Sequence, residues 1–287
     1  MTNSIIFPSD PFNERTPDEA FSNEVTAARW ANIPAALVDH NSLYATADEV
    51  EVRKVPETGS SAFYRGWMMN ADEYGNMFNA FAKRGVNLIT TPENYRAAHY
   101  LPGWIEAFEG LTPKSIILPE NPDKETVLRE AEELQVTAYI VKDFVKSRKH
   151  EWDTACYAPS LHQLPAIVNE FIRLQEDSIV GTVVVREFVE LDKNEPEVRV
   201  WWAHTVPVLI TAHPDNSDAE ITQPSEAFLY AIKERVENLG TPFITTDLAR
   251  KADGEWIVIE VGDGQVSGLP TSVTDEQMEL LFTSVLN

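Results

Sequence analysis

Two carboxylates near the carboxyl end of the chain have the spacing of a divalent-cation site. Asp247 ends one strand-like run and Glu260 ends the next, and residues 252–255 between them carry the Asp-Gly signature of a hairpin turn. Counted outward from that turn, the two acids lie nearly opposite each other, which is destabilising unless a cation intervenes. A Mg²⁺ ion bound to both acids and to phosphate oxygens would supply that cation. We expect Asp263, in a glycine-flanked loop, to bend back toward the same ion; alternatively, one of the facing acids points to solvent.

A group of basic residues interrupts the otherwise acidic chain. Lys142, Lys146, Arg148 and Lys149 fall within eight residues, with Asp143 as the one acid among them. Lys142 ends an apolar strand-like run, whereas the others follow in what reads as a loop. Ammonium groups on a strand end and on the adjacent loop could clamp a polyphosphate from two sides. A solvated charged turn is the alternative.

A second apolar run is broken by charge directly after three valines. Arg186 and Glu187 follow these valines, and charged residues are rarely buried unless they are paired or liganded. The extended backbone at Phe188 and Val189 offers N–H and C=O groups suited to the edge of an adenine. Glu190 could then hydrogen-bond ribose hydroxyls. An edge strand with a simple Arg–Glu pair is the alternative.

Two further arginines are candidates for binding an anion. Arg199 projects from the alternating run 197–202, where a cross-strand salt bridge is the simpler interpretation. Arg65 stands beside a glycine between two aromatic residues, a setting that could receive a substrate carboxylate. Stacking of an exposed Arg65 on Tyr64 or Trp67 is the alternative.

The composition limits the class of partner. The 287 residues include 46 acidic and 23 basic ones, a net charge of −23, which opposes binding to nucleic acid and to anionic membranes. No apolar run is long enough to span a bilayer. Cys156 is the single cysteine, which excludes an intramolecular disulfide and suits a reducing, cytoplasmic setting. The six histidines show no metal-ligand spacing, and the oligomeric state is left open.

The order of predicted elements indicates two regions. Residues 1–115 read as alternating strands and helices, with a capping-box pattern at residues 16–19 that predicts a helix start. We expect the stripe of that helix to include Trp30. Residues 116–287 read as α+β with a largely antiparallel sheet. The fold class is therefore α/β followed by α+β.

The joint order of these motifs resembles the ATP-grasp superfamily, and more narrowly its clade named for one arginine and two lysines. Arg186 matches that arginine, and Lys142 and Lys146 match the lysines. Residues 258–270, VIEVGDGQVSGLP, are similar to the metal-ligand strand and loop of that clade, and YRGWM at residues 64–68 resembles its preceding domain. The resemblance implies an ATP-grasp fold of two α+β subdomains, residues 116–185 and 186–287, preceded by a small α/β pre-grasp domain.

The resemblance also implies roles for the residues above. Lys142 and Lys146 would hold the α- and β-phosphates, and residues 147–152 would close over the nucleotide. The adenine hinge would be Glu187, Phe188 and Val189, and Glu190 would hold the ribose. The γ-phosphate would contact Arg186 and Arg199. One or two Mg²⁺ ions would be bound by Asp247, Glu260 and Asp263. Two departures are a phosphate loop without glycine and Asp263 where many members carry asparagine.

The implied activity is Mg²⁺–ATP-dependent ligation of a carboxylate to an amine through an acyl phosphate, with a small molecule or a peptide as substrate. Such phosphoryl transfer requires positioning and charge neutralisation rather than a covalent side chain. Three alternatives stay open. They are a phosphotransferase that does not ligate, a nucleotide-binding regulator without catalysis, and an acidic mimic of nucleic acid motivated by the net charge.

Overall fold

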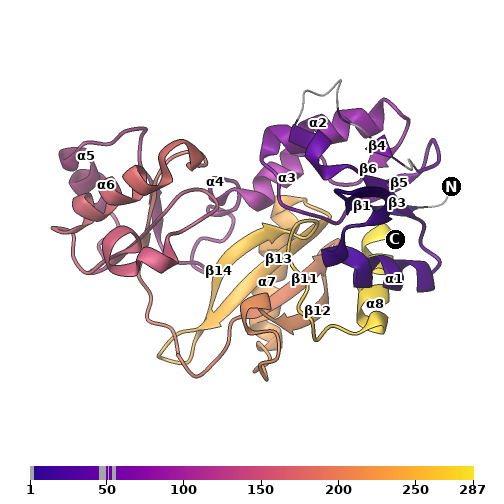
Figure 1. Cartoon of the computed structure of the whole chain (residues 1–287). Coiled ribbons are helices and arrows are strands. Elements are labelled where there is room, and N and C mark those ends of the chain that lie inside the picture. The colour runs from indigo at the N-terminus through magenta and orange to yellow at the C-terminus, as the bar shows by residue number, and fades with distance from the viewer. Residues whose placement is uncertain (1–2, 45–49, 51, 54–55) are drawn as a thin grey trace.

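The computed structural model describes residues 3–44, 50, 52–53 and 56–287, which fold into three sheets in a row. Figure 1 shows the amino-terminal sheet on one side, a central sheet built from the last third of the chain, and a separate lobe with its own small sheet on the other side. Within the described residues, no helix is both long and apolar enough to cross a lipid bilayer.

The amino-terminal sheet is mainly parallel and has the strand order β4-β3-β1-β5-β6, with β2 paired antiparallel to β1. Its central strand β1 is a continuous apolar run buried on both faces, as parallel strands between helices are. The strands are β1 (Ser4–Asp10), β2 (Asn13–Pro17), β3 (Ala35–Val38), β4 (Val52–Arg53), β5 (Ser61–Tyr64) and β6 (Asn87–Leu88).

Helices cover both faces of this sheet, as Figure 1 shows. Helix α2 (Ala71–Ala82) buries Tyr74, Met77 and Phe81 on one face, and it starts with a complete capping box at Asn70. Helix α1 (Ser22–Trp30) covers the other face together with the C-terminal helix α8 (Asp275–Leu286). The end of the chain therefore packs on the amino-terminal layer.

Two short helices, α3 (Pro92–His99) and α4 (Leu101–Trp104), lead from this layer to the outer lobe. The lobe holds an antiparallel sheet of order β7-β10-β8-β9 with two helices on one side. Its elements are β7 (Ser115–Ile117), α5 (Lys124–Glu132), β8 (Tyr139–Lys142), β9 (Tyr157–Ala158), α6 (Leu164–Gln175) and β10 (Val184–Glu187).

The central sheet is antiparallel, with the order β12-β11-β13-β14. One face packs against α4 and α7, and the strands and helix are β11 (Val198–Ala203), β12 (Val206–Ala212), α7 (Glu226–Leu239), β13 (Phe243–Arg250) and β14 (Trp256–Asp263). The antiparallel sheets expected after residue 116 are confirmed. The division at residue 115 stays a prediction.

The helix start expected at residues 16–19 is wrong. Thr16 and Pro17 belong to β2, and the first turn that follows is a 3₁₀ turn capped by Asp18, with α1 beginning at Ser22. Trp30 is 75% exposed rather than part of the buried stripe. Pro17 instead pairs with Ser9 of β1 in a hairpin, a contact that the capping pattern does not report.

Candidate functional site

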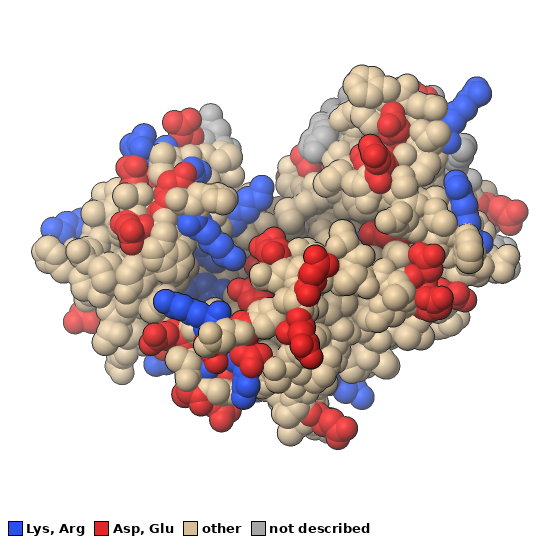
Figure 2. Space-filling model, turned by 60° about the horizontal axis from the view of Figure 1, so that its bottom comes forward, with Lys and Arg blue, Asp and Glu red and all other residues tan. Residues whose placement is uncertain are grey.

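A cavity of about 720 Å³ opens between the outer lobe and the central sheet. Figure 2 shows basic side chains in the hollow beside the outer lobe and acidic side chains along the facing rim. The cavity wall combines residues from both sides, namely Pro113, Ile140, Lys142, Ser147, Lys149, Trp152, Cys156, Tyr157, Arg186, Glu187, Phe188, Val189, Glu190, Leu191, Lys193, Glu197, Ile259 and Glu260. Most of the predicted nucleotide contacts therefore share one cavity.

Strand register places the two main cations on the same face of the lobe sheet. Val184 pairs with Lys142 and Arg186 pairs with Ile140, so these side chains point to the same side. The alternate residues, such as Tyr139, Val141 and Val185, fill the apolar core under α5 and α6. Burial lowers the pKa of Lys142, an effect that the nearby Glu260 opposes. The sheet thus aims two desolvated cations into the cavity.

Arg186 is held in place by uncharged acceptors. Its guanidinium donates to Ser115 Oγ at 3.1 Å, to Thr112 Oγ1 at 2.9 Å and to the carbonyl oxygen of Ile259 at 2.9 Å. The side chain also lies over the ring of Trp104. Desolvation lowers its pKa to about 10, against the opposing charge of Glu260. A buried cation held by neutral groups alone is costly, and an anionic ligand would offset that cost.

The turn after Lys142 is closed by the buried carboxylate of Asp143. That carboxylate accepts hydrogen bonds from the N–H groups of Val145 and Lys146, while Lys142 pairs with Ser147 across the turn. Lys142 and Ser147 therefore point into the cavity together. Lys146, one position before Ser147, is exposed and does not line the cavity, whereas Lys149 does. The structure thus places Lys149 where the sequence led us to expect Lys146.

The far end of the cavity is aromatic and has free backbone donors. Trp152 stacks on Tyr157 with 5.4 Å between ring centroids, and Tyr157 meets Phe188 edge-on at 4.9 Å. Within the described residues, the N–H groups of Val189 and Glu190 find no protein acceptor. Aromatic faces beside unpaired backbone donors suit a planar heterocycle with ring acceptors.

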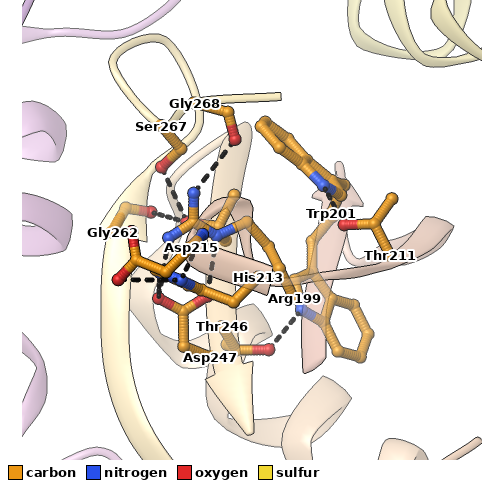
Figure 3. A network of polar contacts seen from close by, with 12 residues as sticks. Arg199, Trp201, Thr211, His213, Asp215, Thr246, Asp247, Gly262, Ser267 and Gly268 are labelled. Atoms are coloured by element: carbon orange, nitrogen blue, oxygen red, sulfur yellow. Dashed lines mark hydrogen bonds and ion pairs between the residues drawn. The ribbon is translucent and has the colours of Figure 1, made fainter. Parts of the chain in front are cut away.

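A polar row crosses the central sheet next to the cavity, and Figure 3 shows its part around Arg199 and Asp247. Arg199 on β11, Asp247 on β13 and Glu260 on β14 stand opposite one another in register. Arg199 donates to both carboxylate oxygens of Asp247, at 2.7 and 2.8 Å, and to the carbonyl oxygen of Gly268 at 3.1 Å. The Nε2 atom of His213 lies 3.7 Å from Asp247 Oδ2. The facing of Asp247 and Glu260 is confirmed, but the cation that neutralises Asp247 here is Arg199.

Arg199 therefore forms the cross-strand salt bridge that the sequence left open. It does not line the cavity, and its guanidinium is bound to Asp247 instead of facing open space. Glu260, by contrast, is exposed at the cavity wall and faces Asp247. Within the described chain, no cluster of three or more acidic, histidine or cysteine residues has the geometry of a metal centre. Of the two facing carboxylates, Glu260 is the one open to the cavity, where phosphate oxygens and water could complete the coordination of a Mg²⁺ ion with few protein ligands.

Asp263 does not join this pair. Strand β14 continues without a bend through Asp263, so Glu260 and Gly262 share one face while Asp263 points to the other. Its carboxylate is fully buried and accepts from the N–H and side-chain amide of Gln265, while Oδ2 has no partner among the residues that the structure describes. The expected bend after Glu260 is wrong because backbone pairing to Ile244 extends the strand.

The buried Asp263 should make folding stability depend on pH. Burial raises its pKa from 3.8 to about 7, against hydrogen bonds from Gln265 and the charge of Arg65. Between these two values the folded state stays protonated while the unfolded state ionises, so stability should fall as pH rises from about 4 to about 7. The loss should not exceed about 4 kcal/mol.

Urea unfolding at pH 4.5, 6 and 7.5 checks this, with Asp263→Asn as the matched variant. The difference in unfolding free energy between wild type and variant should shift in favour of the variant as pH rises. Parallel curves for the two proteins would contradict a raised pKa at Asp263.

Arg65 is a structural residue, and its assignment to a substrate carboxylate is wrong. The side chain is 1% exposed and pairs through Nε and Nη2 with both oxygens of Glu24 at 2.7 Å. Its Nη1 donates to the carbonyl oxygens of Gly264 and Ser267. Every nitrogen is thus occupied. The pairing partner lies 41 residues earlier, which local sequence could not indicate.

Sequence reasoning missed several cavity residues, among them Glu197, Tyr157 and Cys156. Glu197 lines the cavity, and burial raises the pKa of its carboxyl, as do Asp247 and Glu260. The alternation of Glu197 with Arg199 could have indicated this position, since both residues lie on one strand face. Cys156 ends a π-helical turn and Tyr157 follows it; both line the aromatic end, and the local sequence of that turn carries no signature.

Comparison with solved structures gives the same fold throughout the chain. A RimK domain protein ATP-grasp from Sphaerobacter thermophilus matches with a TM-score of 0.65 and 14% identity, over 99% of this chain and 98% of that one. The D-cycloserine synthetase DcsG matches with a TM-score of 0.66 and 16% identity, over 100% and 99%. The D-alanine-D-alanine ligase from Coxiella burnetii matches with a TM-score of 0.61 and 10% identity, over 100% and 94%. The expected ATP-grasp fold class is therefore confirmed.

The chain has no match among curated proteins. Its sequence does match a family profile over residues 125–281, that of an ATP-grasp domain, family 3 of the arginine-and-two-lysine clade. This span contains Lys142, Arg186 and Glu260, so it covers both walls of the cavity. The protein belongs to the ATP-grasp superfamily, in the third family of the clade named for one arginine and two lysines.

Proposed function

We propose that the protein binds Mg²⁺–ATP in this cavity and uses it to activate a carboxylate, which an amine then captures to form a C–N bond. The observation that carries the proposal is the pair of desolvated cations, Lys142 and Arg186, beside an aromatic pocket with free backbone donors. Within the described residues neither cation forms an ion pair. A triphosphate would supply the negative charge that these two cations lack, and a purine would fit the aromatic pocket.

In this proposal the adenine packs against the aromatic cluster of Tyr157 and Phe188, with the N–H groups of Val189 or Glu190 donating to its ring nitrogens. The Glu190 carboxylate hydrogen-bonds the ribose. The peptide N–H of Phe188 is already bound to the carbonyl oxygen of Ala138, which fixes the hinge without a ligand. The pocket is thus preorganised on the base side.

The phosphates lie along the cationic face. Lys142 and Arg186 neutralise phosphate oxygens, and Lys149 on the adjacent turn reaches the same cavity from the other side. The neutral acceptors around Arg186 orient its guanidinium toward the cavity without neutralising its charge. Preorganised charge of this kind stabilises charge that develops during transfer. The exposed Lys146 joins them when its loop closes over the nucleotide.

Glu260 and Asp247 would hold Mg²⁺, which neutralises phosphate charge and aligns the transferred group when bound. Arg199 keeps Asp247 in a fixed rotamer, and its contact to Gly268 fixes the loop beside it. A substrate carboxylate attacks the terminal phosphorus, forming an acyl phosphate and releasing ADP. An amine then attacks the acyl carbon and releases phosphate. The single buried thiol of Cys156 suits a reducing compartment, and we place the reaction in the cytoplasm.

Calorimetric titration of the protein with Mg²⁺–ATP tests the first step. Lys142→Ala should weaken binding by about 1.5–3 kcal/mol, since it removes one charge-assisted contact. Lys124→Ala, at the exposed start of α5, is the matched control and should bind like wild type. Equal affinities for the Lys142 variant and the control would exclude Lys142 from the site.

Product analysis tests the second step. With ATP, a carboxylate and an amine, the proposal predicts ADP, phosphate and an amide. If a phosphorylated product accumulates and no amide forms, the protein is a phosphotransferase. If ATP binds and is never turned over with any acceptor, the protein is a nucleotide-binding regulator. Absence of ATP affinity would leave the acidic-mimic alternative.

A further inference from the structure

The motif YRGWM contains two exposed apolar side chains that the nucleotide site does not use. Trp67 is 44% exposed and Met68 is 45% exposed, although Tyr64 and Arg65 just before them are fully buried. Single exposed apolar residues are common, but this pair sits on a rigid turn. The turn is the feature that calls for an explanation.

The turn is built to present these side chains. The Nε1 atom of Trp67 donates to Asp18 Oδ2 at 2.9 Å, and its ring meets Phe21 edge-on at 5.2 Å. Tyr64 Oη donates to the carbonyl oxygen of Trp67. A Cβ atom at Gly66 would fall 2.1 Å from Tyr64 Oη, so only glycine allows this turn. The indole is therefore locked in orientation while one side stays open to solvent.

The location is a topological switch point of the parallel sheet. Strands β1 and β5 are neighbours, yet the chain leaves β1 toward α1 on one face and leaves β5 toward α2 on the other. Ligands of open α/β sheets bind in the crevice outside the carboxyl ends of strands at such a point. Asp18 follows β2, which pairs with the end of β1, and Trp67 follows β5, so their hydrogen bond links the two sides of this switch point.

This edge of the sheet is connected to the nucleotide site by one short loop. Gly66 N–H donates to the carbonyl oxygen of Gln265, and Arg65 Nη1 donates to that of Ser267. Arg199, beside Asp247, donates to Gly268 of the same loop. The turn that carries Trp67 is therefore hydrogen-bonded to the same loop that contacts Arg199 in Figure 3.

The charges at this edge favour an amine. Asp10, Asp18 and Asp39 lie at the ends of β1, β2 and β3 or just beyond them, and each is partly exposed. The one arginine of the turn, Arg65, is neutralised by Glu24. Burial holds the pKa of His40 below its usual value despite the nearby Asp18 and Asp39, so His40 adds no positive charge at neutral pH. A carboxylate would be repelled here, whereas an ammonium group would be attracted.

We propose that the Trp67–Met68 turn is the docking platform for the amine substrate, and that this substrate carries an aromatic or branched aliphatic group. The apolar group packs on the indole and the thioether, and the ammonium group faces the acids at the strand ends. This inference rests on the proposed ligase activity, because it names the acceptor class for that reaction.

Saturation-transfer NMR at equilibrium tests the platform without turnover. Phenylalaninamide and leucinamide should bind the protein loaded with Mg²⁺ and a non-hydrolysable ATP analogue, and alaninamide and N-acetylphenylalanine should bind much more weakly. Trp67→Ala should weaken binding of the two apolar amides by at least about tenfold. Trp30→Ala, at another exposed tryptophan, should leave binding within about twofold. Trp67→Phe should restore part of the loss.

The outcomes separate this inference from the proposed ligation. Equal binding by Trp67→Ala and Trp30→Ala, preference for the N-acetylated acid, or no binding of apolar amides by wild type overturns the platform. Met68→Ala provides a second variant if Trp67→Ala fails to fold, and it should also weaken the apolar amides. Trp67-dependent binding without amide formation under turnover conditions supports the platform and contradicts the ligase. Amide formation at the same rate in wild type and Trp67→Ala supports the ligase and contradicts the platform.

Discussion

Replacing Glu260 by glutamine should lower ATP turnover by at least about a hundredfold while leaving the fold intact. Glu260 is exposed at the cavity wall and faces Asp247, whose own charge is already neutralised by Arg199. It is therefore the carboxylate with most charge left for a metal ion. Glutamine keeps the size of the side chain and removes that charge.

The measurement is steady-state ADP release, together with Mn²⁺ binding followed by electron paramagnetic resonance in the presence of ATP. Metal affinity should fall in parallel with turnover, and the unfolding transition should not move. Glu255→Gln, at the exposed tip of the same hairpin, is the matched control and should behave like wild type. Wild-type turnover in the Glu260 variant would remove Glu260 from the metal site.

Replacing Arg186 by methionine should separate function from stability. ATP affinity should fall by about ten- to a hundredfold, because a directed cation is lost from the phosphate face. Stability should change by less than about 1 kcal/mol or should rise, because a desolvated charge without a carboxylate partner is removed. The lowered pKa of Arg186, about 10, reports that desolvation cost.

Calorimetry with Mg²⁺–ATP and urea unfolding of the same samples give both quantities. Arg186→Lys serves as the comparison, since it keeps the charge but cannot span Ser115, Thr112 and the Ile259 carbonyl together. Its ATP affinity should lie between wild type and the methionine variant. Strong destabilisation of Arg186→Met with unchanged ATP affinity would make Arg186 a structural residue instead.

Features with a short-range physical cause could be predicted from the sequence. The Asp-Gly turn predicted the hairpin of β13 and β14, although a register shift next to Asp247 completes its pairing with Glu260, and apolar alternation placed Arg186 and Lys142 on strands. Both predictions depend on local backbone geometry. The antiparallel nature of the sheets after residue 116 followed from the same signals.

Features that depend on contacts outside the local pattern could not be predicted from the sequence. Arg65 is buried because Glu24 and the loop at residues 264–267 surround it, and nothing within its own motif reports this. Asp263 points away from Glu260 because pairing with Ile244 extends β14 past the expected loop. Lys149 rather than Lys146 lines the cavity because Asp143 closes the turn one residue before Ser147. The first two outcomes are set by tertiary pairing, whereas the last is set by the local turn at Asp143.

A crystal structure of the protein with Mg²⁺ and a non-hydrolysable ATP analogue tests the central claim most directly. We expect the triphosphate between Lys142 and Arg186, the adenine against Tyr157 and Phe188, and a metal ion bound by Glu260. A nucleotide bound elsewhere, or a bound nucleotide whose metal ion does not touch Glu260 or Asp247, would contradict it.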